Sequence, residues 1–100
     1  MYDLTGKIAL VTGIGGPVDA LGNGKAIAML LARQGAIIEG TDIDEAAGAK
    51  TVVSIRDAGG MAHCKCVNAT DQTAVEDWVK VCAAKHGRVD ILVNNVGQSE

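Results

Sequence analysis

The stretch from Lys7 to Ala28 reads KIALVTGIGGPVDALGNGKAIA, and it decides the fold. An apolar run ends at a threonine and a glycine, a glycine-rich segment follows, and helix-forming residues begin directly after it. This order is typical of a buried strand that leads through a phosphate-binding loop into the N-terminus of a helix. Such a loop binds phosphate through backbone N–H groups, so glycines carry the signal.

Strand and helix signals alternate along the rest of the chain. Right-handed crossovers place the four strands in one parallel sheet, in the order 3-2-1-4, with helices on both faces. The predicted fold class is therefore α/β, a Rossmann-type doubly wound parallel sheet with the pattern β-α-β-α-β-α-β. The expected strands are 7–12, 36–41, 61–67 and 89–93, and the expected helices are 24–34, 44–58 with Asp44 as N-cap, and a segment between a cap at Thr70 or Asp71 and Gly87.

Two of these helices have apolar residues at helical spacing that should pack on the sheet. They are Ala26, Ile27, Leu30 and Leu31 in the first helix, and Val75, Trp78, Val79 and Cys82 in the third.

Composition narrows the class of protein. One hundred residues with 48% hydrophobic content make one small domain, and with only Tyr2 and Trp78 as aromatics its core should be aliphatic. A net charge of −3 without a basic block gives no reason to expect a nucleic-acid partner. No apolar run approaches the ~18 residues of a membrane span, and the N-terminus lacks secretory features, so we expect a cytoplasmic location.

The cysteines are interpreted as small buried hydrophobes in a reducing compartment. Cys64 and Cys66 are two residues apart in an expected strand, where a disulfide would be strained. His63 beside them lacks a second pair of metal ligands, so no metal site is predicted.

Small or polar groups follow each expected strand. Gly22 and Gly24 precede the first helix, and Asp42 follows 18 residues after Gly24, where a carboxylate can accept bonds from an adenosine ribose. The less favoured alternative for Asp42 is a turn or cap aspartate ahead of the next helix, a role for which Asp44 competes. Asn68-Ala69 could meet an adenine ring, or could be an ordinary loop. The last strand ends in Asn94-Asn95-Val96-Gly97.

At these residues the whole chain resembles a classical short-chain dehydrogenase/reductase. The matching pieces are Thr12-Gly13 with Gly22-x-Gly24, Lys25 to Ala28, Asp42, Thr70-Asp71, and the run GRVDILVNNVG from Gly87 to Gly97. The asparagine motif in that run is more specific than the glycine loop.

The resemblance implies an oxidoreductase that transfers hydride between an alcohol or carbonyl substrate and NAD, with NADP less favoured because Asp42 would repel a 2′-phosphate. It also implies a homo-oligomer in the complete protein. Carried over residue by residue, Gly13, Gly22 and Gly24 would line the pyrophosphate, Asp42 the adenosine ribose, Asn68 and Ala69 the adenine, and Asn95 and Gly97 the nicotinamide side, while Asn94 would join strands of the sheet.

The chain departs from the family pattern in three places. The family spaces its glycines as TG-x3-G-x-G, whereas eight residues separate Gly13 from Gly22 here. A second register uses Ala20-Leu21-Gly22 as the G-x-G segment, and Gly22 takes part in both. Val96 replaces the motif's alanine, and Asn68 stands where many members have aspartate.

The family's catalytic serine and Tyr-x-x-x-Lys pair have no counterpart here, because Tyr2 is the only tyrosine and Ser99 lies too near the asparagine motif. Residues 1–100 are therefore expected to be the N-terminal, cofactor-binding part of a single Rossmann domain, inactive alone, with no catalytic residue. The unpaired edge of the last strand supports the same expectation. Alternatives are a non-catalytic nucleotide-binding or redox-sensing module, and an enoyl-reductase relative with a similarly long first loop.

Overall fold

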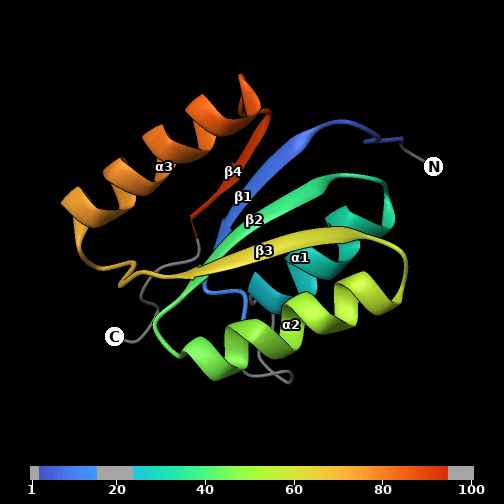
Figure 1. The fold of residues 1–100 in the computed structure, drawn as a ribbon, viewed down its shortest axis with the longest axis horizontal. Helices are drawn as coiled ribbons and strands as arrows, with labels where there is room; N and C mark the ends of the chain where they lie inside the picture. The colour runs from blue at the N-terminus through green and yellow to red at the C-terminus, as the bar shows by residue number, and fades with distance from the viewer. Residues whose placement is uncertain (1–2, 16–23, 95–100) are drawn as a thin grey trace.

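The computed structural model describes residues 3–15 and 24–94. Four parallel strands form one sheet in the order β3-β2-β1-β4, which confirms the predicted topology (Figure 1). The elements are β1 (Ile8–Thr12), α1 (Gly24–Arg33), β2 (Ile37–Asp42), α2 (Glu45–Asp57), β3 (Met61–Cys66), α3 (Gln72–His86) and β4 (Ile91–Val93).

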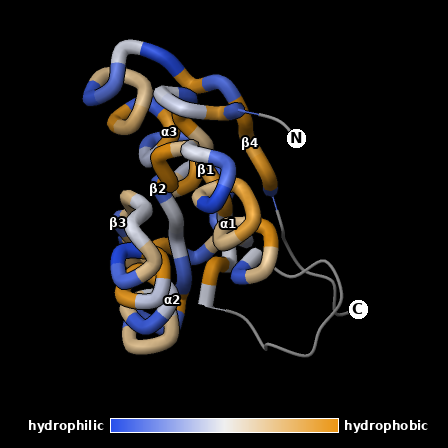
Figure 2. The backbone as a smooth tube through the Cα atoms, turned by 90° about the vertical axis from the view of Figure 1, so that its right-hand side faces the viewer, coloured by the Kyte–Doolittle hydropathy of each residue, from blue (hydrophilic) through white to orange (hydrophobic). Residues whose placement is uncertain are grey.

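The helices cover both faces of the sheet. Helices α1 and α2 lie on one face and α3 lies on the other (Figure 1). The reason is topological, since β1 to β3 step in one direction across the sheet and the chain then crosses back to β4 on the far side of β1. Figure 2 shows β4 in the orange of hydrophobic residues, whereas α2 alternates between hydrophilic and hydrophobic residues.

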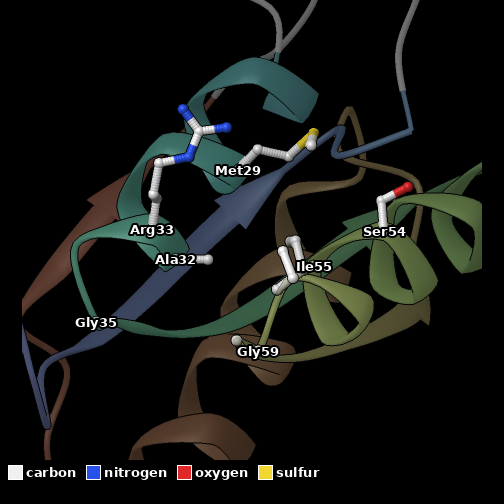
Figure 3. Close-up of a pocket in the computed structure, with 9 residues that line it drawn as sticks. Met29, Ala32, Arg33, Gly35, Ser54, Ile55 and Gly59 are labelled. Atoms are coloured by element: carbon white, nitrogen blue, oxygen red, sulfur yellow. The ribbon is translucent and has the colours of Figure 1, made fainter.

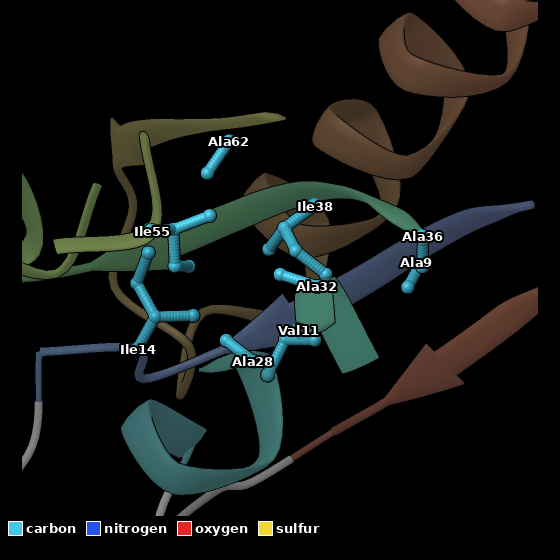
Figure 4. Close-up of a cluster of buried hydrophobic side chains, with 9 residues drawn as sticks. All are labelled: Ala9, Val11, Ile14, Ala28, Ala32, Ala36, Ile38, Ile55 and Ala62. Atoms are coloured by element: carbon cyan, nitrogen blue, oxygen red, sulfur yellow. The ribbon is translucent and has the colours of Figure 1, made fainter. Parts of the chain in front are cut away.

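The larger core cluster is aliphatic and lies between the sheet, α1 and α2 (Figure 4). Its strand members are small or branched, as expected for a parallel sheet that is buried on both faces. Its buried residues are Ala9, Val11, Ile14, Ala28, Ala32, Ala36, Ile38, Ile55 and Ala62.

The predicted apolar face of α1 was right for Ile27 and Leu31, which pack against the core, and wrong for its other two residues. Ala26 is exposed and Leu30 is 56% exposed, whereas Gly24, Ala28 and Ala32 are buried. These three small residues recur every four positions and let the helix axis approach the sheet closely. Hydrophobicity alone favoured the larger side chains, but the short distance between helix and sheet selects the smallest ones.

Helix α3 packs as predicted. Trp78 and Cys82 are buried against Ile8, Leu10 and Val67 on the other face of the sheet. The helix begins at an N-cap aspartate, Asp71, whose side chain accepts from the Ala74 N–H, and it ends at Gly87 with a left-handed φ of 77°. Helix α2 is capped in the same way, because Asp44 accepts from the Ala47 N–H at 3.1 Å.

Strand β4 begins at Ile91, two residues later than predicted, and Asp90 just before it bonds Ile8 through its backbone N–H as well as its side chain. The Asp90 carboxylate accepts from the Ile8 N–H at 2.8 Å, and Arg88 donates to the same carboxylate at 2.6 Å. These bonds from Arg88 and Ile8 hold the pKa of Asp90 below its usual value.

Within the described residues, no helix is long and apolar enough to cross a membrane.

A charged group lies buried in the middle of β2. The Glu39 side chain is 8% exposed, and its carboxylate contacts Lys85 Nζ at 2.9 Å, His86 Nε2 at 2.6 Å and His63 Nδ1 at 3.5 Å. Burial by itself would raise the pKa of Glu39, but the bonds from His86 and Lys85 prevail and hold it below 4.5. Glu39 therefore attaches the end of α3 to the sheet as a carboxylate.

We expect Glu39→Gln to lower the free energy of unfolding by about 1–3 kcal/mol at pH 7, because the variant keeps the shape and loses the charge. A carboxylate with a depressed folded-state pKa stabilises the fold above its unfolded pKa and loses that contribution as pH falls through the folded value. The difference in the free energy of unfolding between wild type and Glu39→Gln should therefore shrink toward about pH 3. Urea unfolding at both pH values measures it.

Glu76→Gln is the matched control, because Glu76 is exposed on α3, the helix whose end Glu39 contacts. It should change stability by less than about 0.5 kcal/mol at either pH. An equal loss for Glu39→Gln at both pH values would show that its charge does not stabilise α3.

Candidate functional site

The carboxyl ends of all four strands meet at one edge of the sheet. Thr12 pairs with Thr41, Asp42 pairs with Cys66, and Val11 pairs with Val93. Loops that follow parallel strands in a doubly wound sheet form the crevice where ligands bind. Of the predicted site residues, Gly13, Gly24, Asp42, Asn68 and Ala69 are described at this edge. Gly22, Asn95 and Gly97 lie outside the described residues.

Gly24 lies directly against the backbone at the end of β1. A Cβ at this position would be 2.5 Å from the carbonyl oxygens of Thr12 and Gly13, too close for any side chain. Gly13 itself has a left-handed φ of 69°, which favours glycine. Both glycines are therefore required by the turn between β1 and α1, and the first turn of α1 starts at the crevice.

The N-terminus of α1 is suited to an anion. Its first turn contains no acidic residue, so no acidic side chain within that turn offsets the positive end of the helix dipole. The neighbouring α2 differs, with Glu45 in its first turn and Asp44 as its cap.

The start of the glycine loop is bonded to β2. The Ile14 N–H donates to the Thr41 carbonyl at 3.0 Å, and the Gly15 N–H donates to Asp42 Oδ2 at 2.7 Å. The Ile14 side chain is fully buried and lies against Gly40, where a Cβ would be 2.5 Å from Ile14 Cδ1. Figure 4 shows Ile14 pointing into the core from the end of β1.

Asp42 is 9% exposed, and both of its carboxylate oxygens accept backbone bonds. Oδ2 accepts from Gly15, and Oδ1 accepts from the Asp44 N–H at 2.8 Å. Asp42 therefore does act as a turn residue, because its side chain accepts a bond within the turn that leads to the Asp44 cap. Among the described residues each oxygen accepts one bond, which leaves it a further lone pair that could bind a ligand hydroxyl.

Asn68 makes a loop of its own. Its side-chain oxygen accepts from the N–H and the hydroxyl of Thr70, at 2.9 and 2.6 Å. Its backbone carbonyl accepts from Asp71. The exposed side chain therefore uses its oxygen within the turn, and its amide nitrogen is the group that could meet a ligand. Ala69 follows it, half-buried.

Asn94 joins the ends of β1 and β4, as expected for this position. Its side-chain oxygen accepts from the Thr12 hydroxyl at 3.3 Å, and Thr12 is fully buried.

Sequence reasoning missed two features of this edge. Ile43 is 67% exposed between Asp42 and Asp44, and it offers an apolar surface beside the crevice. Gly15 is a contact residue, because a Cβ there would be 2.6 Å from the Ala47 carbonyl carbon of α2. The exposed Ile43 could have been found from the sequence, because a large apolar residue between two aspartates is a visible signal. The contact of Gly15 with α2 could not, because it joins segments that are distant in the sequence.

The cysteines are free thiols, but the prediction that they are buried was right only for Cys82, because Cys64 is half-buried and Cys66 is exposed. Burial raises the pKa of Cys64 to about 11, helped by the nearby charges of Asp42, Cys66 and Glu45. Burial also raises the pKa of Cys82. No group of three metal-ligating side chains occurs among residues 3–15 and 24–94.

A surface hollow of about 340 Å³ lies between α1 and α2 (Figure 3). It is at the C-terminal ends of both helices, and therefore at the edge of the sheet opposite the crevice. Its lining includes Met29, Ala32, Arg33, Ser54, Ile55 and Gly59.

Comparison with known proteins places these features in a family. The short chain dehydrogenase family model matches residues 7–100. A 3-oxoacyl-acyl-carrier-protein reductase of Vibrio cholerae is 42% identical over 96 residues, which are 95% of this chain and 36% of that protein. A short-chain dehydrogenase/reductase homologue of Bacillus subtilis is 40% identical over 90 residues, which are 89% of this chain and 78% of that protein.

Solved structures have the same fold. A short-chain dehydrogenase/reductase of Burkholderia xenovorans superposes with a TM-score of 0.87 at 43% identity. The aligned region is 100% of this chain and 40% of that protein. A metagenomic short-chain oxidoreductase in complex with NADP and an NAD+-bound xylitol dehydrogenase superpose with TM-scores of 0.82 and 0.81. The chain thus spans less than half of these solved proteins, and the neighbours include complexes with either cofactor.

We expect Gly24→Ala to destabilise the chain by about 1–3 kcal/mol, because the new methyl group overlaps the Thr12 and Gly13 carbonyls. Alanine is the better helix former by about 1 kcal/mol, so a gain in stability would contradict the close contact. Thermal unfolding measures the change, and the neighbouring Lys25→Ala should stay within about 0.5 kcal/mol of wild type.

Cys64 should be a poor nucleophile at neutral pH. With a pKa of about 11, its alkylation by iodoacetamide at pH 8 should be on the order of 100-fold slower than that of free cysteine, and should accelerate up to about pH 11. A variant with Cys66→Ser and Cys82→Ser isolates this thiol, and one that keeps only the exposed Cys66 is the control. Rapid alkylation of Cys64 at pH 7 would restore the redox-sensing alternative.

Proposed function

Because the chain belongs to the short-chain dehydrogenase family of oxidoreductases, we propose that residues 1–100 are its cofactor-binding part and bind NAD. In the complete protein this part would serve hydride transfer to or from an alcohol or carbonyl substrate. The bound nicotinamide would supply the hydride chemistry, and the residues of this chain would bind and orient it.

One observation carries the proposal, namely the contact of Gly24 with the carbonyl ends of Thr12 and Gly13. This contact brings the N-terminus of α1 to the carboxyl edge of the sheet with no side chain between them. The positive end of the helix dipole then faces the crevice, where a pyrophosphate would be stabilised. A side chain at this glycine would force the helix away from the strand.

The preference for NAD over NADP rests on Asp42. Its carboxylate lies beside the loop and has lone pairs for the ribose hydroxyls, whereas a 2′-phosphate at the same place would meet like charge. Solved neighbours include complexes with both cofactors, so the preference is argued from this residue and not from the family.

The adenine would lie between the loops after β2 and β3. Ile43 offers an exposed apolar surface for one side of the ring. Asn68 would donate from its amide nitrogen to a ring nitrogen, because its oxygen is engaged by Thr70. Asn95 and Gly97 would lie on the nicotinamide side, with Gly22 at the pyrophosphate.

A nucleotide-binding module without catalysis is the second candidate. The Bacillus subtilis homologue favours it, because this chain spans 78% of that protein, and so related chains of modest length exist. A turnover assay of the complete protein with NAD and simple alcohols separates the two functions, since both predict binding and only the first predicts oxidation.

We expect the chain to bind NAD more tightly than NADP in calorimetric titration. Asp42→Ala should weaken NAD binding about tenfold or more, because it removes both the ribose acceptor and the bond to Gly15. Asp57→Ala, at the exposed end of α2, is the control and should leave both affinities unchanged. Tighter binding of NADP by the wild type would show that Asp42 does not select the cofactor.

A further inference from the structure

One peptide group of the glycine loop is bonded at both of its ends. The carbonyl oxygen of Ile14 accepts from Thr51 Oγ1 at 2.8 Å, and the N–H of the same peptide, that of Gly15, donates to Asp42 Oδ2 at 2.7 Å. The carbonyl and the N–H of a trans peptide point in opposite directions, so these two bonds fix its rotation. The peptide therefore links α2 to the proposed ribose carboxylate.

The Thr51 hydroxyl does not bond only within its own helix. A buried helical threonine commonly bonds the carbonyl four residues earlier, and here that distance, to Ala47, is 3.4 Å. The bond to Ile14 is 0.6 Å shorter, from 3.4 and 2.8 Å, and the residue is fully buried. The hydroxyl is thus directed at the loop, in a place from which water is excluded.

The backbone of α2 is shaped to accept this loop. A Cβ on Gly15 would be 2.6 Å from the Ala47 carbonyl carbon and 2.7 Å from the Gly48 nitrogen. A Cβ on Gly48 would be 2.5 Å from Cys64 Sγ and 3.3 Å from the Asp42 Cβ. Both glycines let α2 approach the loop and β2 together, which brings Thr51 within bonding distance.

We propose that Thr51 is a positioning residue of the dinucleotide site. Its hydroxyl holds the Ile14–Gly15 peptide, and that peptide holds the carboxylate of Asp42 in the orientation that meets the adenosine ribose. The inference rests on the proposed binding of NAD, in which Thr51 touches no part of the cofactor. It makes α2 part of the site through a contact that the family motif does not include.

Thr51→Val tests the hydroxyl, because valine has nearly the same shape and suits the buried position. Thr51→Ser keeps the hydroxyl and is the rescue variant. Thr73→Val makes the same change at an exposed position of α3 and is the matched control. NAD affinity by calorimetry, melting temperature, and amide hydrogen exchange of Gly15 in the nucleotide-free chain are measured for each.

For Thr51→Val we expect NAD binding about threefold to tenfold weaker and faster exchange at Gly15. Thr51→Ser and Thr73→Val should match wild type in both. A lower melting temperature with unchanged affinity and unchanged exchange at Gly15 would show a purely structural role and overturn the proposal. Failure of the wild type to bind any nucleotide would overturn the proposed function, while the exchange at Gly15 would still report whether Thr51 holds the loop.

A measurement on the wild type covers the case in which Thr51→Val does not fold. A hydroxyl proton that is buried and bonded exchanges slowly, so the Thr51 proton should be visible by NMR and close to Ile14. Rapid exchange of this proton with water would overturn the proposal without any variant.

Discussion

The approach of α1 to the end of β1 is the contact on which the rest of the structure depends. Gly24 lies against the carbonyls of Thr12 and Gly13 with no room for a side chain, and Ala28 and Ala32 continue the contact along the helix. This spacing sets how α1 covers the sheet and directs its positive end at the carboxyl edge of the strands. The anion binding proposed for that edge would follow from the packing of the helix.

The loop after β1 is held from its other side by β2 and α2. Ile14 is buried over Gly40, and the peptide that follows it is bonded to Asp42 and Thr51. Asp42 therefore has one role in the turn toward α2 and a second, proposed role in binding a ribose. A substitution at this position would change the loop as well as the proposed cofactor preference, since the carboxylate proposed to meet the ribose also accepts from Gly15.

Several expectations could be drawn from sequence because they depend on neighbouring residues. The caps at Asp44 and Asp71 and the stop at Gly87 follow from local chemistry, and the structure confirms them. The apolar face of α1 was predicted only in part, with Ile27 and Leu31 correct and Leu30 wrong. Leu30 is more hydrophobic than Ala28, and only the helix–sheet distance shows which one fits. Glu39 gave no local sign of burial, since its partners Lys85 and His86 are over forty positions away.

By itself the sequence determined the order of strands and helices, the parallel sheet and the family, because periodicity, turn residues and motif spacing are local properties of the chain. It also named the glycines and Asp42 as candidates for a nucleotide site. Only the tertiary structure decided that Asp42 is bonded to the loop, that Gly15 and Gly48 admit α2, and that Thr51 reaches Ile14. These contacts join segments that the crossovers bring together. Their energies depend on interatomic distances to within tenths of an ångström, which the spacing of residues in the sequence does not reveal.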